Sequence, residues 1–496
     1  VVQKTNATFI GHFDLVTKFN EGNRYFDPMD KRYRNAALEA MDALIETGKP
    51  FEINTGGMYR GFRTEAYPSI QLLKDLKARG GSILLSSDSH DGQSIGFQFA
   101  EAAKMAKERK IAVVVVGLPD SYESEAFDRE HMRMPSGYLA LVDAVSEANP
   151  NTVVVLLGGS VMELPFADRV KAILYMGLPG QAGGEAVADI LLGRANPSGK
   201  LTESWPVSYS DVISRDTFGV RDPEYHESIY VGYRYYDKAK LQVRYPFGHG
   251  LSYTSFEYSD LKINDKNVNF SVKNTGSVSG SEVVQLYVAP KTEGVFRPVR
   301  ELRGFDKIHL LPGESKSVSF TLDDRSFAVW SDGWRIPSGE YVIEVGSSSK
   351  DIRLSERITL AGEEVKSICP DSWYHTLIGK PTRKEWEGLM GRSIPPSVEP
   401  KKGEYTMDNS CMEMKDFSFM MKIQYKVTEA IIAKGFGGKR DMSDPAFKMM
   451  IVCATDCPMR SAVISSGGAM PESVARGMLL MANGKFFKGI AAMMKK

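Results

Sequence analysis

The sequence has few cysteines, no long apolar run and no excess of charge of either sign. Its four cysteines, all in the last third of 496 residues, are too few for a disulfide-built scaffold and fit a reducing compartment. No stretch approaches the roughly 18 apolar residues that a bilayer span needs, and the first residues lack the pattern of a signal peptide. Lys plus Arg equals Asp plus Glu at 62 each, so no net field attracts nucleic acid or anionic lipid. We expect a cytoplasmic protein without a nucleic-acid or membrane partner.

The length and composition predict several folded domains. A chain of 496 residues exceeds one hydrophobic core and corresponds to about three domains at roughly 100–200 residues each. Apolar residues make up 42% and charged residues 25%, values typical of globular proteins, which excludes wholesale disorder.

The first part of the chain alternates strands and helices. An amphipathic helix is expected over residues 34–49 and another over residues 69–81, and short apolar strands follow each of them. This order predicts a parallel α/β layout, in which polar residues at the carboxyl ends of strands face the active-site rim. The polar residues at these strand ends are His12, Asp14, Asp88 and His90.

Two changes of pattern follow along the chain. Residues 111–118, 152–159 and 172–179 are Val/Ile/Leu-rich and predict further parallel strands buried on both faces. After about residue 259, alternating apolar and polar runs between turns predict an antiparallel β-sandwich. Tyr341, Ile343 and Val345 are expected to share its inner face.

The last part of the chain is rich in methionine. Fifteen of the 23 methionines lie between Met390 and Met494, within amphipathic helical patterns. Flexible Met side chains fill irregular cores more often than they bind cofactors, so we interpret them as packing residues.

A cluster of carboxylates follows the strand over residues 111–118. Glu123, Glu125 and Asp128 lie within six residues and beside Arg129, where a loop at a strand's carboxyl end is open to ligand. The alternative to a functional site is a solvated acidic loop.

Several motifs in the same order resemble glycoside hydrolase family 3, the β-glucosidase and β-xylosidase family. Residues 122–129, 180–206, 230–237 and 245–256 resemble its C-terminal α/β-sandwich domain, and residues 297–322 resemble the fibronectin type III-like module that often follows it. The segment over residues 459–490 is similar to the extension of some bacterial members.

This resemblance implies retaining hydrolysis of a β-glycosidic bond, with Glu125 as the acid/base and a carbohydrate as substrate. The role needs a protonated carboxylic acid, which partial burial or a neighbouring carboxylate, Glu123 or Asp128, would favour. Ala126 stands where the family usually has Gly, which is expected to tighten the loop. The nucleophilic Asp of the family lies in an N-terminal TIM barrel, in a Ser-Asp-Trp motif that this chain lacks. We therefore expect Glu125 alone to hydrolyse glycosides negligibly. Glycoside hydrolysis of this kind is expected to need no cofactor.

The segment before residue 105 resembles the C-terminal part of a histidinol-phosphatase-type PHP metal hydrolase. The resemblance rests on residues 11–20, 51–61 and 86–91, and it implies that His12, Asp88 and His90 bind a divalent metal, zinc, manganese or iron. The early ligands of that family are not in the chain, so the alternative is a remnant with solvated His and Asp. The two resemblances meet at about residues 104–110.

Other motifs are interpreted as structural. The Gly-rich residues 180–186 lack the Lys-Ser/Thr end of a P-loop and predict a tight strand-to-helix turn. Cys453 and Cys457 have no further ligand nearby, which argues against a metal site. His249 is expected in a turn or in packing. The tyrosines at 230, 233, 235 and 236 favour core packing, with a sugar site as the alternative.

The predicted fold class is α/β in four parts. These are an incomplete PHP-like barrel portion (residues 1–108), an α/β sandwich with a largely parallel sheet that lacks its first strands (109–258), a fibronectin type III-like β-sandwich (259–361) and a helical extension (362–496). Three functions follow: a family 3-like glycoside hydrolase, a PHP-type phosphatase, or an inactive binding fragment. The first is the leading hypothesis.

Overall fold

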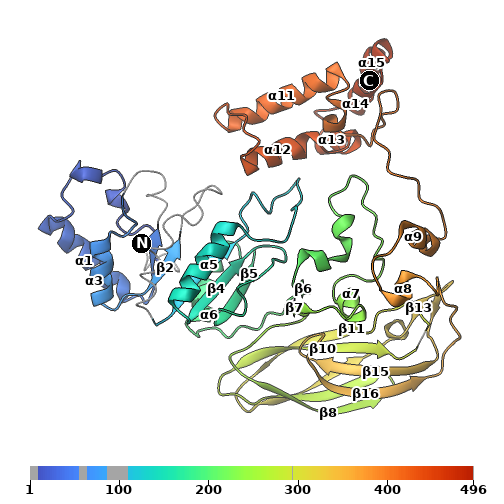
Figure 1. Cartoon of the computed structure of the whole chain (residues 1–496), viewed down its shortest axis with the longest axis horizontal. Coiled ribbons are helices and arrows are strands. Elements are labelled where there is room, and N and C mark those ends of the chain that lie inside the picture. The colour runs from blue at the N-terminus through green and yellow to red at the C-terminus, as the bar shows by residue number, and fades with distance from the viewer. Residues whose placement is uncertain (1–8, 55–63, 87–109, 293, 495–496) are drawn as a thin grey trace. The chain divides into compact units, whose positions relative to one another are not determined.

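A computed structural model describes residues 9–54, 64–86, 110–292 and 294–494 of the chain (Figure 1). The chain divides into two compact units. The first consists of Val1–Gly117, Met132–Phe218 and Glu224–Ser393, and the second of Leu118–His131, Gly219–Pro223 and Ile394–Lys496. No helix among the described residues is long and apolar enough to cross a membrane.

A five-stranded parallel sheet forms the start of the first unit. Its interior comes from β-branched residues: Val114, Val154 and Val155 are almost completely buried, because strands covered on both faces favour such side chains. In spatial order the strands are β1 (Phe51–Asn54), β2 (Ile83–Ser86), β3 (Ala112–Gly117), β4 (Thr152–Leu157) and β5 (Ala172–Gly177). Its helices are α1 (Lys31–Ile45), α3 (Ile70–Ala78), α5 (Ser136–Ala148) and α6 (Gly183–Leu191).

The sheet corrects the predicted fold class. The expectation of a separate PHP-like barrel portion is wrong, because β1 and β2 continue the same sheet as β3, β4 and β5. Leu85 of β2 pairs in parallel with Val114 of β3. The strand–helix pattern is shared by barrels and open sheets, so periodicity could not distinguish them. The domain boundaries at residues 109, 259 and 362 stay predictions.

Aromatic side chains pack the connection between this sheet and the sandwich. Tyr230, Tyr235 and Tyr236 lie in one buried cluster with Trp373 and Tyr374, which confirms their interpretation as packing residues. The Tyr230 hydroxyl donates to the Tyr374 carbonyl at 2.7 Å. The elements here are β6 (Trp205–Pro206), α7 (Tyr233–Lys238), β7 (Val243–Tyr245), α8 (Trp373–Thr376) and α9 (Arg383–Met390). Short 3-10 helices are η1 (Leu15–Thr17), η2 (Glu21–Asn23), η3 (Tyr209–Asp211), η4 (Ile213–Asp216) and η5 (Asp324–Ser326).

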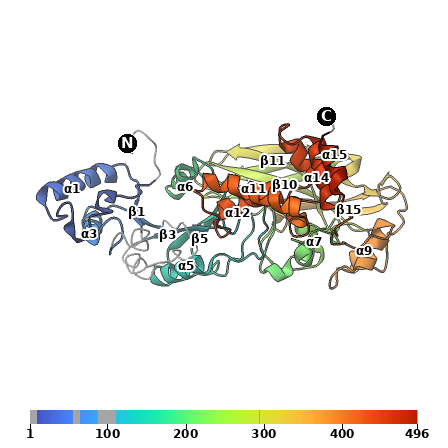
Figure 2. The same cartoon turned by 90° about the horizontal axis from the view of Figure 1, so that it is seen from above.

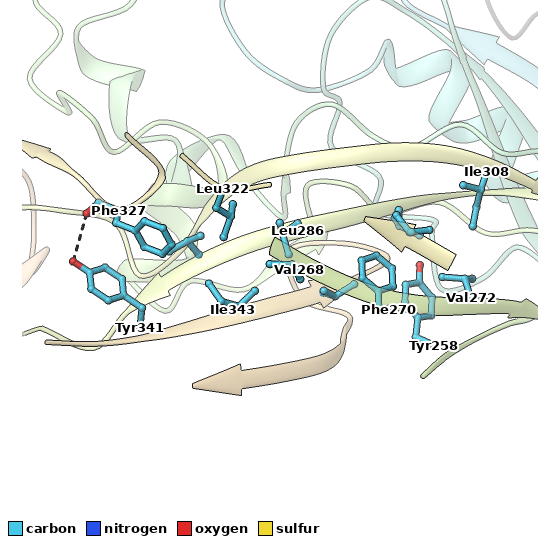
Figure 3. Close-up of a cluster of buried hydrophobic side chains, with 14 of the residues drawn as sticks. Tyr258, Val268, Phe270, Val272, Leu286, Ile308, Leu322, Phe327, Tyr341 and Ile343 are labelled. Atoms are coloured by element: carbon cyan, nitrogen blue, oxygen red, sulfur yellow. Dashed lines mark hydrogen bonds between the residues drawn. The ribbon is translucent and has the colours of Figure 1, made fainter. Parts of the chain in front are cut away.

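Two antiparallel sheets form the predicted β-sandwich, and Figure 3 shows part of its core. Tyr341, Ile343 and Val345 are fully buried in that core, which confirms their predicted inner face. The Tyr341 hydroxyl donates a hydrogen bond to the Pro337 carbonyl at 2.7 Å. The polar atom of this buried side chain therefore has a hydrogen-bond partner. One sheet has the order β11 (Glu301–Leu310), β10 (Gly280–Pro290), β15 (Gly339–Gly346), β16 (Ile352–Leu360), and the other β12 (Ser315–Thr321), β9 (Asn267–Asn274), β8 (Phe256–Asn264). A small hairpin pairs β13 (Val329–Trp330) with β14 (Trp334–Arg335).

The second unit is built largely from helices, and side chains cap the N-termini of some of them. Asp444 accepts the backbone N–H of Phe447 at the start of α12, and Ser410 and Glu413 form a capping box on α10. Met414, Met421 and other methionines fill its core, which confirms the packing interpretation. The helices are α10 (Cys411–Met414), α11 (Phe419–Gly435), α12 (Pro445–Thr455), α13 (Met459–Ser465), α14 (Glu472–Ala482) and α15 (Phe486–Met493).

Two glycines let the last two helices approach closely. Figures 1 and 2 both show α14 and α15 side by side. A Cβ atom at Gly477 would lie 2.6 Å from the Gly489 carbonyl oxygen, and a Cβ atom at Gly489 would lie 2.6 Å from that of Gly477. Both distances are shorter than van der Waals contact, so the packing requires glycine at each position.

Candidate functional site

The loop after β3 folds into a tight turn that presents Glu125. Ser124 and Phe127 form an antiparallel bridge, so Glu125 and Ala126 occupy the tip. The Pro119 carbonyl accepts the N–H groups of Tyr122 at 2.8 Å and Glu123 at 3.1 Å, which fixes the chain just before the turn. Ala126 has a φ of 71°, in the left-handed region that favours glycine. Glycine would therefore adopt this backbone conformation at position 126 with less strain than alanine does.

Glu125 is exposed at this tip. Within the described part of the chain its carboxylate makes no hydrogen bond and no ion pair. Asp128 is also exposed, whereas Glu123 is half-buried. The three predicted carboxylates therefore share one loop but differ in environment, and Glu125 is available to a partner group from outside the turn.

Arg129 provides the positive charge of the loop. Its guanidinium is partly buried, and this burial lowers the pKa of Arg129, while the nearby Glu123 carboxylate and Tyr122 act in the opposite direction. Tyr122 also packs against His131, with ring centroids 5.8 Å apart. Arg129 thus sits inside the base of the loop and Glu125 at its outer end.

The loop belongs to the second unit rather than to the sheet from which it emerges. The ammonium group of Lys448, on α12, lies 4.1 Å from the centroid of the Phe127 ring. Sequence reasoning missed Lys448, because it lies more than 300 residues from the turn and no local pattern links the two.

The predicted metal ligands are only partly within the described residues. His12 Nδ1 lies 3.3 Å from Glu52 Oε2, and its Nε2 lies 3.4 Å from Asn54 Nδ2. Asp88 and His90 lie outside the described residues. Within the described ranges no group of three His, Cys, Asp or Glu side chains could hold a metal ion. The described neighbours of His12 do not form a ligand set, and the metal site stays a prediction.

His249 has the packing role expected of it. Its ring stacks on Tyr245 at a centroid distance of 5.1 Å, and its carbonyl accepts the N–H of Leu201 at 2.8 Å. Burial lowers the pKa of His249, and the positive charge of Lys200 acts in the same direction. Of the Gly-rich residues 180–186, residues 180–182 form the predicted turn and residues 183–186 begin α6.

Models of two protein families match parts of the chain. Residues 22–253 match the glycosyl hydrolase family 3 C-terminal domain, and residues 282–349 match the fibronectin type III-like domain. The first match includes most of the segment that resembles a PHP hydrolase, so no comparison supports a PHP domain there.

Individual relatives agree with this assignment. The thermostable beta-glucosidase B of Acetivibrio thermocellus is 48% identical over 287 residues, which are 55% of this chain and 38% of that protein. The exo-alpha-(1->6)-L-arabinopyranosidase of Bifidobacterium breve is 43% identical over 53% of this chain and 36% of that protein. The crystal structure of the beta-glucosidase from Kluyveromyces marxianus in complex with glucose superposes with a TM-score of 0.52 at 39% identity, over 55% of this chain and 34% of that chain.

The chain spans less than two fifths of the length of these relatives. The first family match includes the parallel sheet and the loop that bears Glu125, and the second includes part of the sandwich. We conclude that residues 22–253 are similar to the C-terminal domain of glycosyl hydrolase family 3 and residues 282–349 to a fibronectin type III-like domain.

Proposed function

We propose that this chain supplies the proton-donating part of a retaining β-glycosidase that cleaves β-linked glucosides or xylosides, with Glu125 as the acid/base. The observation that carries the proposal is the position of Glu125. It stands exposed at the tip of a tight turn that directly follows β3, within a family 3 C-terminal domain. A carboxyl group placed in this way can reach a glycosidic oxygen brought to it from outside the loop.

The chemistry requires a second carboxylate. In the first step that carboxylate attacks the anomeric carbon, the glycosidic C–O bond breaks, and Glu125 gives its proton to the departing oxygen. In the second step Glu125 takes a proton from water, whose oxygen displaces the enzyme carboxylate from the sugar. The two carboxyl groups must lie about 5–5.5 Å apart. We propose that the nucleophile is the Asp of a family 3 TIM barrel.

The substrate class follows from the relatives. Their names describe beta-glucosidases and an arabinopyranosidase, and one crystal structure of a beta-glucosidase holds glucose. These sugars share the pyranose ring. A pyranoside is therefore the class of substrate that we propose.

Hydrolysis of p-nitrophenyl β-glucoside and β-xyloside tests the proposal. The chain by itself is expected to release p-nitrophenol negligibly, whereas the chain joined to a family 3 TIM barrel is expected to be active. In that protein Glu125→Gln should lower kcat/KM by about 10²–10⁴-fold, the usual contribution of general acid–base catalysis. Glu130→Gln, an exposed residue of the same loop, is the matched control and should retain most of the activity. An active protein in which Glu125→Gln has no larger effect than Glu130→Gln would contradict the role.

A further inference from the structure

The residues that flank Glu125 are held by parts of the chain far away in sequence. The second unit brings together three segments: the loop over Leu118–His131, the short segment Gly219–Pro223 and the helical region Ile394–Lys496. Glu125 makes no hydrogen bond or ion pair with any described residue. Within the described ranges, a restraint on Glu125 therefore acts through its neighbours in the turn.

The first contact joins the turn directly to a helix. Phe127 closes the turn by its bridge to Ser124, and the Lys448 ammonium lies 4.1 Å from the centroid of its ring. This distance is well within the range of a cation–π interaction. Lys448 lies on the first turn of α12, whose N-terminus is fixed by the Asp444 cap. The cation is thus carried by a rigid element.

The second contact runs through the segment Gly219–Pro223. Gly219 lies beside Asp128, since a Cβ atom built on it would be 3.8 Å from Asp128 Oδ2. Two residues further on, Arg221 Nη2 lies 3.0 Å from Glu413 Oε1. The other oxygen of Glu413 accepts the N–H of Ser410 at 2.8 Å in the capping box of α10. One carboxylate therefore caps a helix and holds the arginine at the same time.

We propose that the helical C-terminal region positions the acid/base loop, with Lys448 and Arg221 as positioning residues. Phe127, two residues after Glu125, is the point at which Lys448 restrains the turn, and Arg221 holds the segment whose Gly219 lies beside Asp128. The effect of this restraint on catalysis rests on the proposed function. The structural restraint of the loop by the helical region does not. The Met-rich core of the helical region would then stabilise the helices that hold the loop in position.

Hydrogen–deuterium exchange of the full chain tests this proposal without any measurement of hydrolysis. Lys448→Met keeps the length of the side chain and removes its charge. Amides within residues 121–130 should then exchange about two- to fivefold faster, the factor that corresponds to an exposed cation–π contact. Lys448→Arg should restore the wild-type rate, because a guanidinium also binds an aromatic face. Lys422→Met, which removes an exposed lysine from α11, should leave residues 121–130 unchanged.

Unchanged exchange of residues 121–130 in Lys448→Met, or equal rates in Lys448→Met and Lys448→Arg, would overturn the proposal. If Lys448→Met also speeds exchange throughout α14 and α15, the substitution has destabilised the whole helical region. In that case the exchange of residues 121–130 in Phe127→Leu tests the proposal. Faster exchange confined to residues 121–130 in Phe127→Leu, with the wild-type rate restored in Phe127→Tyr, supports the restraint. No change in Phe127→Leu refutes it. These exchange results test the restraint even if the protein does not hydrolyse glycosides.

Discussion

At the scale of single residues, the turn that bears Glu125 contains one strained position. Ala126 adopts a φ of 71°, and a left-handed conformation costs a residue with a Cβ atom about 1–2 kcal/mol. Glycine adopts it without that cost, although glycine also has more freedom to lose on folding. The strain lies next to the proposed acid/base, where a tight turn sets the direction of the Glu125 side chain.

Ala126→Gly should therefore raise the free energy of unfolding of the second unit, by up to about 1 kcal/mol. Ala430→Gly, in the middle of α11, is the matched control and should lower it by about 1 kcal/mol, since glycine is unfavourable inside helices. Urea unfolding of both variants gives the comparison. Equal losses of stability in the two variants would show that Ala126 carries no backbone strain.

At the scale of elements, the close approach of α14 and α15 depends on glycine. A methyl group at Gly477 would meet the Gly489 carbonyl oxygen and the Met493 side chain. Gly477→Ala should destabilise the helical region by about 1–3 kcal/mol, the usual cost of overpacking. Gly435→Ala, at the end of α11 with open space around it, should be neutral or stabilising. A thermal melt in which Gly477→Ala unfolds no earlier than Gly435→Ala would contradict this packing.

Sequence patterns predicted elements better than the contacts between them. The alternation of Tyr341, Ile343 and Val345 predicted one buried face because side chains of a strand alternate between faces. The loop with Glu125 was found from its residues and its resemblance to a family. The pairing of β2 with β3 and the contact of Lys448 with Phe127 join segments distant in sequence, so no local periodicity could show them. For the same reason, periodicity does not show that β1 and β2 share one sheet with β3, β4 and β5.

At the scale of the whole molecule, an ionic network joins the family 3 domain to the sandwich within the first unit. Arg300 Nη1 lies 3.3 Å from Glu344 Oε2 of β15, and it donates to the Ser349 carbonyl at 2.8 Å. Its Nε lies 3.9 Å from Asp237 of α7, which Lys350 also contacts at 2.7 Å. Burial raises the pKa of Glu344, and the positive charge of Arg300 opposes that effect.

Arg300→Met should lower the free energy of unfolding of the first unit by roughly 1–3 kcal/mol, because it leaves two buried carboxylates without this cation. Arg357→Met is the matched control. Its pair with Glu340 at 3.1 Å is largely exposed, so its loss should cost less than about 1 kcal/mol. Denaturant unfolding measures both. Losses of equal size would show that the network contributes no more than a surface ion pair.

The most direct test of the acid/base role is the dependence of kcat/KM on the leaving group in Glu125→Gln. The measurement uses the chain joined to a family 3 barrel and aryl β-glucosides whose phenols differ in acidity. An acidic phenol such as dinitrophenol departs without a proton, so the variant should hydrolyse its glucoside almost as well as the wild type does. A weakly acidic phenol needs the proton, and its glucoside should lose about 10²–10⁴-fold. The same loss for every leaving group, or no loss for any of them, would contradict the account.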